Sequence, residues 1–218
     1  MFSNLYMLRI TNKLTSSTSK ISFSIFTATH NRANDFLPQC VESIQNQRGN
    51  LFDYEHIIIN NASTDNTSDY LKRIVKKYPN VKVVESKTNS GTAAAFNKAL
   101  KIATGDFLII MGDDDMLLPY SLQAHANFIA AHRKIDWASG FLLLIDENNQ
   151  LIPNEISILY NQYEYPEAAP ELFERLLKGN VIMCSSAIAR RESVIELGGC
   201  DENVHCEDWH VVKARARW

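Results

Sequence analysis

Residues 107–115 read FLIIMGDDD, so five apolar residues and one glycine lead directly into three carboxylates. The apolar run has the length and composition of a buried strand, which would deliver Asp113, Asp114 and Asp115 to its carboxyl end. Hard cations such as Mg²⁺ and Mn²⁺ prefer carboxylate oxygen, and a bound cation relieves the repulsion between adjacent acids. We therefore interpret the three acids as a site for a divalent cation.

The alternative interpretation is an acidic surface turn or a helix cap, because short acidic turns are common. The flanking sequence argues against this alternative. Residues 116–119, MLLP, follow the acids and indicate the start of a helix. The acids would then lie between a buried strand and a helix, which is where open α/β sheets form their ligand-binding crevice.

Length and composition favour one folded domain without a nucleic-acid partner. A chain of 218 residues can bury a full core, and its 45% hydrophobic content argues against disorder. The net charge of -3 gives no basic footprint, so we do not expect nucleic acid to bind. Residues 1–20 look like a loose leader before a single domain at 21–218.

The cysteines and the hydropathy pattern indicate a cytoplasmic protein. The cysteines lack metal-ligand spacing and are too few for a disulfide scaffold, which favours reduced thiols. They stand at positions 40, 184, 200 and 206. No apolar run approaches the ~20 residues of a membrane span, and the first six residues lack the charged region of a signal peptide.

Strand and helix signals alternate through the first half, about residues 21–119. Four strands are expected at residues 21–27, 54–59, 81–85 and 107–111, with helices at about 36–44, 63–78 and 91–104. In the second of these helices Leu71, Ile74, Val75 and Tyr78 are expected to form one apolar stripe. The pattern predicts an α/β fold with an open, mostly parallel sheet and helices on both faces.

The second half, about residues 120–218, has a mixed pattern. The polar cluster at residues 146–149 indicates the turn of a hairpin that begins near residue 135. A strand is expected at residues 181–189 between helices at 171–178 and 191–197, and a last helix from about residue 207.

Three polar loops are expected at one edge of the sheet, because the carboxyl ends of parallel strands meet there. These loops are residues 27–32, 60–65 and 112–115. Late in the chain, a glycine-rich turn at residues 198–202 leads to Glu207 and Asp208. Taken alone, this acid pair is typical of a helix start, where the helix dipole favours negative charge.

Together these motifs resemble the family 2 glycosyltransferases of GT-A fold. The resemblance covers about residues 21–216 and depends on five motifs in the family's order, none of which is specific alone. The motifs are THNR at 29–32, NASTD at 61–65, NSG at 89–91 with Asn97, DDD at 113–115, and GG at 198–199 with DE at 201–202 and EDW at 207–209.

The resemblance implies an inverting transfer of a sugar from a nucleotide diphosphate donor, with a UDP- or TDP-sugar expected. The acceptor would be a hydroxyl of a glycan or lipid-linked molecule in bacterial surface polysaccharide synthesis. Mg²⁺ or Mn²⁺ would neutralise the leaving diphosphate through Asp114 and Asp115, which the sequence does not distinguish. Asp113 would face the donor ribose. Asp208 would be the general base, and Glu207 would support it or touch the acceptor.

The donor side is expected to include residues from all three loops and from the segment after the third strand. The expected donor-binding residues are Thr27, Ala28, Thr29, His30, Arg32, Asn61, Lys87, Asn89, Gly91, Asn97 and Asp113. Asn61 stands where the family often has an acid. Its amide could accept the N3 proton of uracil or thymine, or donate to the N3 of cytosine. His30 stands where the family often has Tyr, and it could stack on the base or be a loop histidine without a ligand.

Two other functions are alternatives to the glycosyltransferase. A sugar-nucleotide pyrophosphorylase needs a basic, glycine-rich loop after the first strand, whereas this chain has ATHNR at residues 28–32. A non-catalytic nucleotide-sugar binding module is the other alternative. Members of the family usually continue beyond the position of Trp218, so the chain is either a minimal catalytic domain or lacks a C-terminal part. Such a part is the expected place for peripheral association with the inner face of the membrane.

Overall fold

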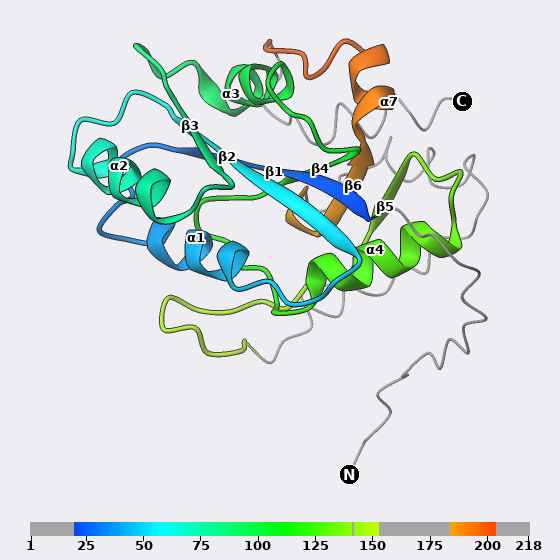
Figure 1. Ribbon diagram of the computed structural model, residues 1–218. Helices are drawn as coiled ribbons and strands as arrows, with labels where there is room; N and C mark the ends of the chain where they lie inside the picture. Colours follow the sequence, from blue (N-terminus) through cyan, green and yellow to red (C-terminus); the bar gives the residue numbers. More distant parts are fainter. Residues whose placement is uncertain (1–19, 141, 153–183, 204–218) are drawn as a thin grey trace.

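The computed structural model describes residues 20–140, 142–152 and 184–203, which form a six-stranded sheet with helices on both faces (Figure 1). The strand order is β3-β2-β1-β4-β6-β5. The strands are β1 (Ile21–Thr29), β2 (Phe52–Asn60), β3 (Val81–Glu85), β4 (Phe107–Ile110), β5 (Trp137–Ser139) and β6 (Ala187–Arg190). The first four pair in parallel, whereas β6 pairs antiparallel with both β4 and β5.

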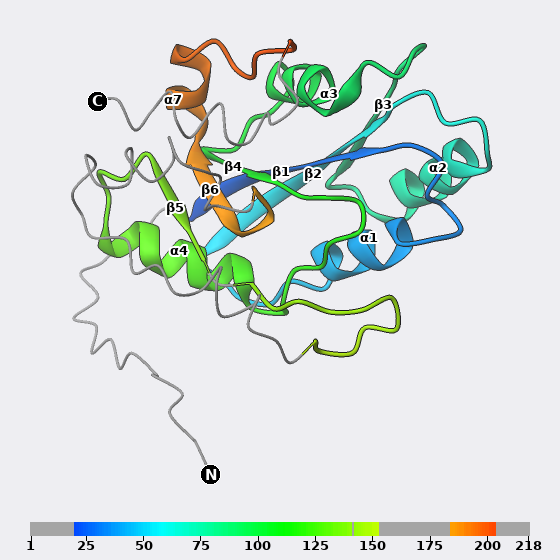
Figure 2. The ribbon, with the colours of Figure 1, turned by 180° about the vertical axis from the view of Figure 1, so that it is seen from behind.

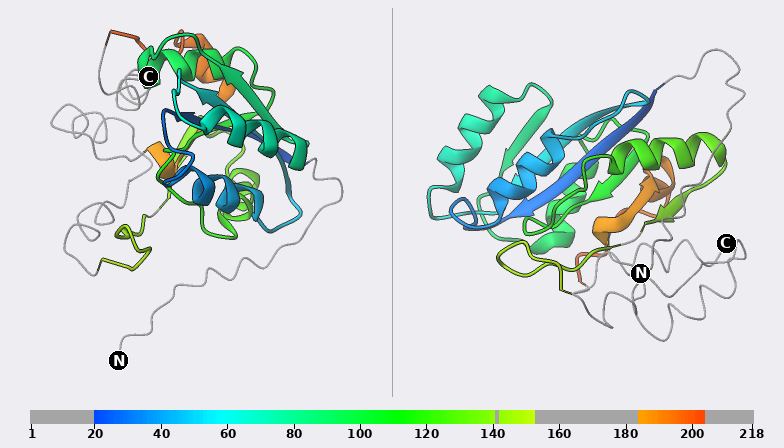
Figure 3. Two further views of the ribbon diagram at one scale, coloured as in Figure 1. Left: turned by 90° about the vertical axis from the view of Figure 1, so that its left-hand side faces the viewer. Right: turned by 90° about the horizontal axis from the view of Figure 1, so that it is seen from below.

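Helices cover both faces of the sheet. The helices are α1 (Leu37–Gln45), α2 (Thr67–Lys77), α3 (Gly91–Leu100), α4 (Ser121–Ala131) and α7 (Arg191–Glu196), with a 3₁₀ turn, η1, at Cys184–Ser186. In Figures 1 and 2, α3 and α7 lie above the sheet and α1 and α4 below it. The view from below in Figure 3 shows α2, α1 and α4 side by side on the lower face.

The central strand β1 is buried on both faces, although its alternation of apolar and small polar residues is typical of a half-buried strand. Phe23 and Ile25 point to the core below the sheet, where they pack with residues of α1 and α4. Phe26 points to the opposite core and meets Phe96 of α3 edge to face, with ring centroids 5.6 Å apart. Because both of its faces are buried, β1 holds a fixed place in the centre of the sheet, and the loop that follows it forms part of the site.

The expected α/β class, parallel order and helices on both faces are confirmed. The helix expected at 91–104 ends at Leu100, because the chain turns there and brings the Thr104 backbone N–H to Glu55 Oε1 at 2.6 Å. The expected stripe of the second helix is wrong at Val75, whose side chain is 42% exposed. Leu71 and Ile74 carry the contact instead, because Val75 lies too far around the helix to reach the sheet.

The described part of the second half, residues 120–140, 142–152 and 184–203, is less regular than expected. Among the described residues of the expected hairpin arm, Trp137–Ser139 forms a strand, and it pairs with β6. The turn at residues 146–149 is confirmed by the antiparallel bridge between Ile145 and Leu151. Of the strand expected at 181–189, residues 184–186 form η1 and the strand occupies Ala187–Arg190. The helices expected at 171–178 and from 207 lie outside the described residues, whereas α7 confirms the one at 191–197.

The Glu55 carboxylate links neighbouring strands near their amino ends. Its Oε1 accepts hydrogen bonds from Ser24 Oγ and Thr104 N, each at 2.6 Å, and its Oε2 lies 2.5 Å from Lys82 Nζ. Burial alone would raise the pKa of the Glu55 carboxyl, but these partners lower the pKa to about 2. The carboxylate therefore joins β1, β2, β3 and the segment before β4 at the end of the sheet opposite the site.

We predict that Glu55→Gln lowers the free energy of unfolding at pH 7 by about 1–3 kcal/mol, because buried partners lose a charged acceptor. A depressed pKa stabilises the fold above the unfolded value of 4.5, and this contribution is lost as pH falls toward 2. Urea titrations at pH 7 and pH 3 should therefore show a smaller difference between variant and wild type at pH 3. Asp53→Asn, which alters an exposed acid of the same strand, is the control and should change stability little.

Candidate active site

The carboxyl ends of β1, β2 and β4 meet at one edge of the sheet, and the amino end of β6 lies beside them. The register fixes this arrangement: Thr29 pairs with Asn60, and the Met111 backbone N–H donates to Phe26 O at 2.8 Å. Because β6 runs antiparallel to β4, η1 reaches the same edge. The three loops expected to converge are therefore brought together, with a fourth segment beside them.

Asn31 joins the loop after β1 to the loop after β2. Its Oδ1 accepts from the backbone N–H of Thr64 at 2.7 Å and of Asp65 at 3.3 Å, and its own N–H donates to Ser63 Oγ at 2.9 Å. Asn31 has a φ of 59°, in the left-handed region that asparagine tolerates better than most residues. The two loops are thus held as one unit.

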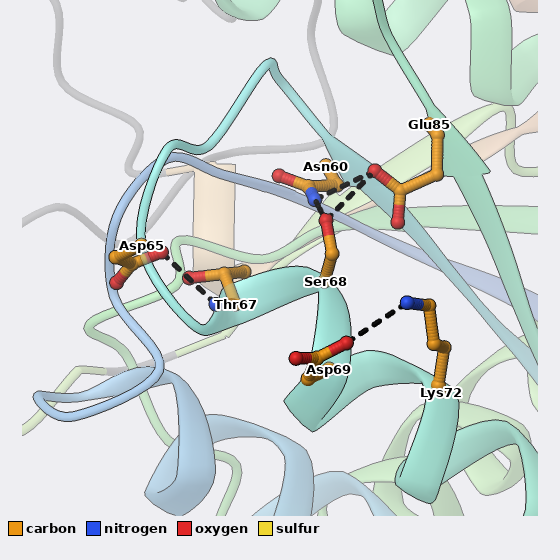
Figure 4. A network of polar contacts seen from close by, with 7 residues as sticks. All are labelled: Asn60, Asp65, Thr67, Ser68, Asp69, Lys72 and Glu85. Carbon is orange, nitrogen blue, oxygen red and sulfur yellow. Dashed lines mark hydrogen bonds and ion pairs between the residues drawn. The ribbon is translucent and has the colours of Figure 1, made fainter.

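The base of the second loop is organised by Asn60 and Asp65 (Figure 4). Asn60 Nδ2 donates to Ser68 Oγ at 2.8 Å and to Glu85 Oε2 at 2.7 Å, which ties β2 to α2 and β3. Asp65 Oδ1 accepts from the Thr67 backbone N–H at 3.0 Å at the start of α2. This acid satisfies one of the free N–H groups of the helix, as the sequence from 63 to 67 predicts.

His30 is exposed, and both of its ring nitrogens lie within hydrogen-bond distance of loop residues. Its Nδ1 lies 3.0 Å from the Asn61 carbonyl oxygen, and its Nε2 lies 3.2 Å from Asn31 Nδ2. A carbonyl oxygen only accepts and an amide nitrogen only donates, so Nδ1 donates to Asn61 and Nε2 accepts from Asn31. His30 therefore helps to hold the two loops together by its edge.

Asn61 is 5% exposed, and its side chain is bound by the loop before α3. Its Nδ2 donates to Asn89 Oδ1 at 2.8 Å and to Gly91 O at 3.3 Å, and its Oδ1 accepts from the Ser90 backbone N–H at 3.2 Å. The backbone partners Gly91 O and Ser90 N fix which way the amide points. Both amide hydrogens are used, and Oδ1 keeps one lone pair for a further donor.

Asp113 is half-buried, whereas Asp114 and Asp115 are exposed. Burial raises the pKa of the Asp113 carboxyl above its ordinary value, and the Thr29 hydroxyl and Arg32 guanidinium oppose the rise. Arg32 Nη1 itself lies 2.6 Å from Asp35 Oδ2. Asp113 therefore interacts with two residues of the first loop, Thr29 and Arg32.

The side chains of Asp114 and Asp115 fold back over Gly112. A Cβ atom at Gly112 would lie 2.9 Å from Asp114 Oδ1 and 2.7 Å from Asp115 Oδ2, so the two carboxylates converge on a space that glycine leaves open. No group of three or more His, Cys, Asp or Glu in the described parts of the chain forms a complete metal site. Two carboxylates nevertheless fit Mg²⁺ or Mn²⁺, since such ions commonly take their other ligands from substrate phosphates and water.

Two side chains that the sequence did not single out support the acidic loop. Ser185 of η1 donates a hydrogen bond from Oγ to Asp115 Oδ2. Cys40 Sγ donates to Gly112 O at 3.3 Å, and burial raises the pKa of this thiol to about 12, so it stays protonated. The position of Ser185 could have been found only from the antiparallel direction of β6, which brings the residues before it to this edge.

The other expected donor-side residues are distributed between the core, the segment after β3 and α3. Thr27 is fully buried, and its Oγ1 lies 3.0 Å from His56 Nε2, so its side chain belongs to the core below the site. Ala28 packs against the upper core. Lys87 is exposed in the segment after β3, and Asn97 of α3 bonds to the turn at Cys200. Glu207 and Asp208 lie outside the described residues.

Comparison with protein families shows to which family the chain belongs. Residues 24–198 match the family described as glycosyl transferase family 2, which is more than half of the chain. The chain belongs to glycosyltransferase family 2. Membership in family 2 removes the pyrophosphorylase alternative, and it agrees with the order of the five motifs.

Family 2 relatives and solved structures agree with this assignment. The poly(ribitol-phosphate) beta-glucosyltransferase of Bacillus spizizenii is 37% identical over 97 residues, 44% of this chain and 15% of the relative. The crystal structure of S. aureus TarS 1-349 has a TM-score of 0.67 at 24% identity and covers 89% of this chain and 55% of TarS 1-349. The mannosyltransferase PcManGT of Pyrobaculum calidifontis, in complex with GDP-Man and Mn²⁺, has a TM-score of 0.61 at 19% identity over 89% of this chain and 51% of PcManGT.

The structural likeness establishes the GT-A fold for this family 2 chain. The chain covers less than two thirds of the length of the first curated relatives that it matches. For example, the match covers 44% of the length of a relative from Methanocaldococcus jannaschii. In the described residues no helix is both long enough and apolar enough to cross a membrane.

Proposed function

We propose that the protein transfers a sugar, with inversion, from a nucleotide diphosphate donor to a hydroxyl of a glycan or lipid-linked acceptor. The observation that carries the proposal is the convergence of Asp113, Asp114 and Asp115 with the loops of Asn31 and Asn61 at the sheet edge of a family 2 chain. TarS structures with UDP and with UDP-GlcNAc support a nucleotide-sugar donor. Relatives named for teichoic acid synthesis support an acceptor of the bacterial surface.

Different residues of the chain have different roles in the proposed reaction. The acceptor oxygen bonds to the anomeric carbon as the bond from that carbon to the diphosphate oxygen breaks. The acceptor proton passes to the Asp208 carboxylate, which acts as general base, and Glu207 supports it. Asp113 faces the donor ribose. Asp114 and Asp115 would hold Mg²⁺ or Mn²⁺, which when bound neutralises the charge that develops on the departing diphosphate.

The test of the proposal is donor turnover that requires an acceptor. The protein is incubated with a panel of UDP- and TDP-sugars, Mn²⁺, and glycan or polyol-phosphate acceptors, and released nucleotide and glycosylated product are measured. Product formation above that of the Asp208→Asn variant supports the enzyme. Tight donor binding without turnover on any acceptor would instead favour the non-catalytic binding module.

We predict that donor nucleotide binding requires a divalent cation held by Asp114 and Asp115. UDP at 100 times its Kd with Mn²⁺ should stabilise the wild type by about 2.7 kcal/mol, and EDTA should remove this effect. In Asp114→Ala/Asp115→Ala the stabilisation should be lost while the protein stays folded, as measured by thermal unfolding. Asp53→Ala/Asp69→Ala removes two exposed acids elsewhere and is the control. Equal stabilisation by UDP in EDTA would contradict a metal-dependent site.

We predict that the donor base presents a hydrogen-bond donor to Asn61 Oδ1. Uracil and thymine carry a proton on N3 and cytosine does not, and Asn61 has no free hydrogen to offer cytosine. UDP and TDP should therefore bind about 3- to 10-fold more tightly than CDP by calorimetry, the worth of one hydrogen bond. Asn89→Ala frees one Asn61 amide hydrogen, so it should reduce the preference for UDP and TDP over CDP. CDP as the tightest ligand of the wild type would show that Asn61 does not read the base.

We predict that Asp208→Asn lowers the rate of transfer at least about 100-fold, because the amide cannot accept the acceptor proton. Nucleotide binding in Mn²⁺ should persist, as measured by calorimetry with UDP. Glu207→Gln should reduce the rate less if Glu207 only supports the base. Wild-type transfer by Asp208→Asn would mean that the base is another group, with Asp201 the next candidate.

A further inference from the structure

Asn97 of α3 holds the glycine-rich turn at residues 198–202. Its Nδ2 donates to Cys200 O and to Glu202 Oε1, each at 2.9 Å, and its Oδ1 accepts from the Cys200 backbone N–H at 2.9 Å. These three bonds link segments that are more than 100 residues apart in the sequence. Both amide hydrogens and one acceptor position are therefore committed to the turn, which leaves little of the side chain for a donor.

The turn is shaped for this contact. Gly198 and Gly199 have φ values of 83° and 79°, in the region that favours glycine. A Cβ atom at Gly199 would lie 2.5 Å from Asn97 Oδ1 and 3.4 Å from Leu100 Cδ2, so a side chain there would push the turn away from α3. Cys200 is buried in the same core cluster as residues of α3. The double glycine is explained by the close approach of the turn to Asn97.

The other end of α3 belongs to the donor side. The helix begins at Gly91, whose carbonyl oxygen accepts from Asn61 Nδ2. Ala95, Phe96 and Ala99 are buried against the sheet, so the helix cannot shift without disturbing the core. At ten residues the helix is about 15 Å long. It therefore connects the loop around Asn61 to the turn that leads toward Asp208.

We propose that Asn97 is a positioning residue that sets the direction in which the chain leaves the turn at residues 198–202 toward the catalytic base. The proposal rests on the proposed function, in which Asp208 takes the acceptor proton. Asp208 follows Glu202 by six residues, a span of at most about 20 Å, so the position of the turn limits where the base can lie. Asn97 acts through the Glu202 turn and does not touch the donor, in contrast to the role that the family resemblance implies for it.

The test compares Asn97→Asp with Asn127→Asp. The aspartate at 97 keeps the acceptor for Cys200 N but turns a carboxylate oxygen toward Cys200 O and the Glu202 carboxylate, which breaks two bonds by repulsion. Asn127 is an exposed helix residue whose Oδ1 accepts from Gln123 Nε2 at 2.9 Å, a bond that aspartate retains. The control therefore makes the same chemical change without loss of a contact.

The expected result for Asn97→Asp is a fall in kcat of about 10- to 100-fold, as for a misplaced catalytic group, with the donor KM and the Kd of UDP in Mn²⁺ unchanged. Asn127→Asp should match the wild type. The double variant Asn97→Asp/Glu202→Gln should recover part of kcat, because the amide that replaces the Glu202 carboxylate can donate to the aspartate at position 97. Backbone amide exchange in residues 197–203 should quicken in Asn97→Asp and not in the control.

Three outcomes would overturn the proposal. A higher donor KM with unchanged kcat would make Asn97 a donor contact. If Asn97→Asp lowered the unfolding temperature but left kcat unchanged at temperatures well below it, the link between Asn97 and the turn would be only structural. Unchanged amide exchange in residues 197–203 would show that Asn97 does not hold the turn, and this measurement decides the matter even if the wild type transfers no sugar and the proposed function itself fails.

Discussion

The site depends on the parallel pairing of β4 with β1. In this register Phe26 lies beside Ile110, and the Met111 N–H donates to Phe26 O at 2.8 Å, so the strands end together and their loops meet. Side chains alternate between the faces of a sheet, and a slip of one residue would exchange the side chains that β4 places in the two cores. The large side chains on both faces of β1 oppose such a slip. The position of Asp113 beside Thr29 follows from this pairing.

Around this edge the loops are joined to one another by asparagine amides. Asn31 joins the first two loops, Asn60 ties β2 to α2 and β3, Asn61 holds the start of α3, and Asn97 holds the turn at Cys200. A neutral amide both donates and accepts, so it can bridge two backbone segments without adding charge. Buried ions would cost free energy to desolvate unless they were well paired. The side chains that join the loops are therefore neutral, although two of them also donate to the carboxylates of Glu85 and Glu202.

The sequence predicted the parts that depend on local pattern. Strand ends, helix faces and the acids at residues 113–115 follow from periodicity and from residue type, and the structure confirms their convergence. It did not predict Ser185 on Asp115, because that contact depends on the antiparallel direction of a strand about 70 residues away. It assigned Asn97 to the donor, although the turn at Cys200 takes its amide. The sequence did not show which way Thr27 points, because a threonine at the end of a buried strand can face the core or the crevice.

The arrangement of charge has a consequence for how an anionic donor can bind. A diphosphate would meet Asp113, Asp114 and Asp115 together, while the guanidinium of Arg32 lies within reach of two of them but is shared with Asp35. Burial already raises the pKa of Asp113, so this edge accommodates negative charge poorly. A divalent cation that arrived with the diphosphate would offset the repulsion between the phosphates and these acids.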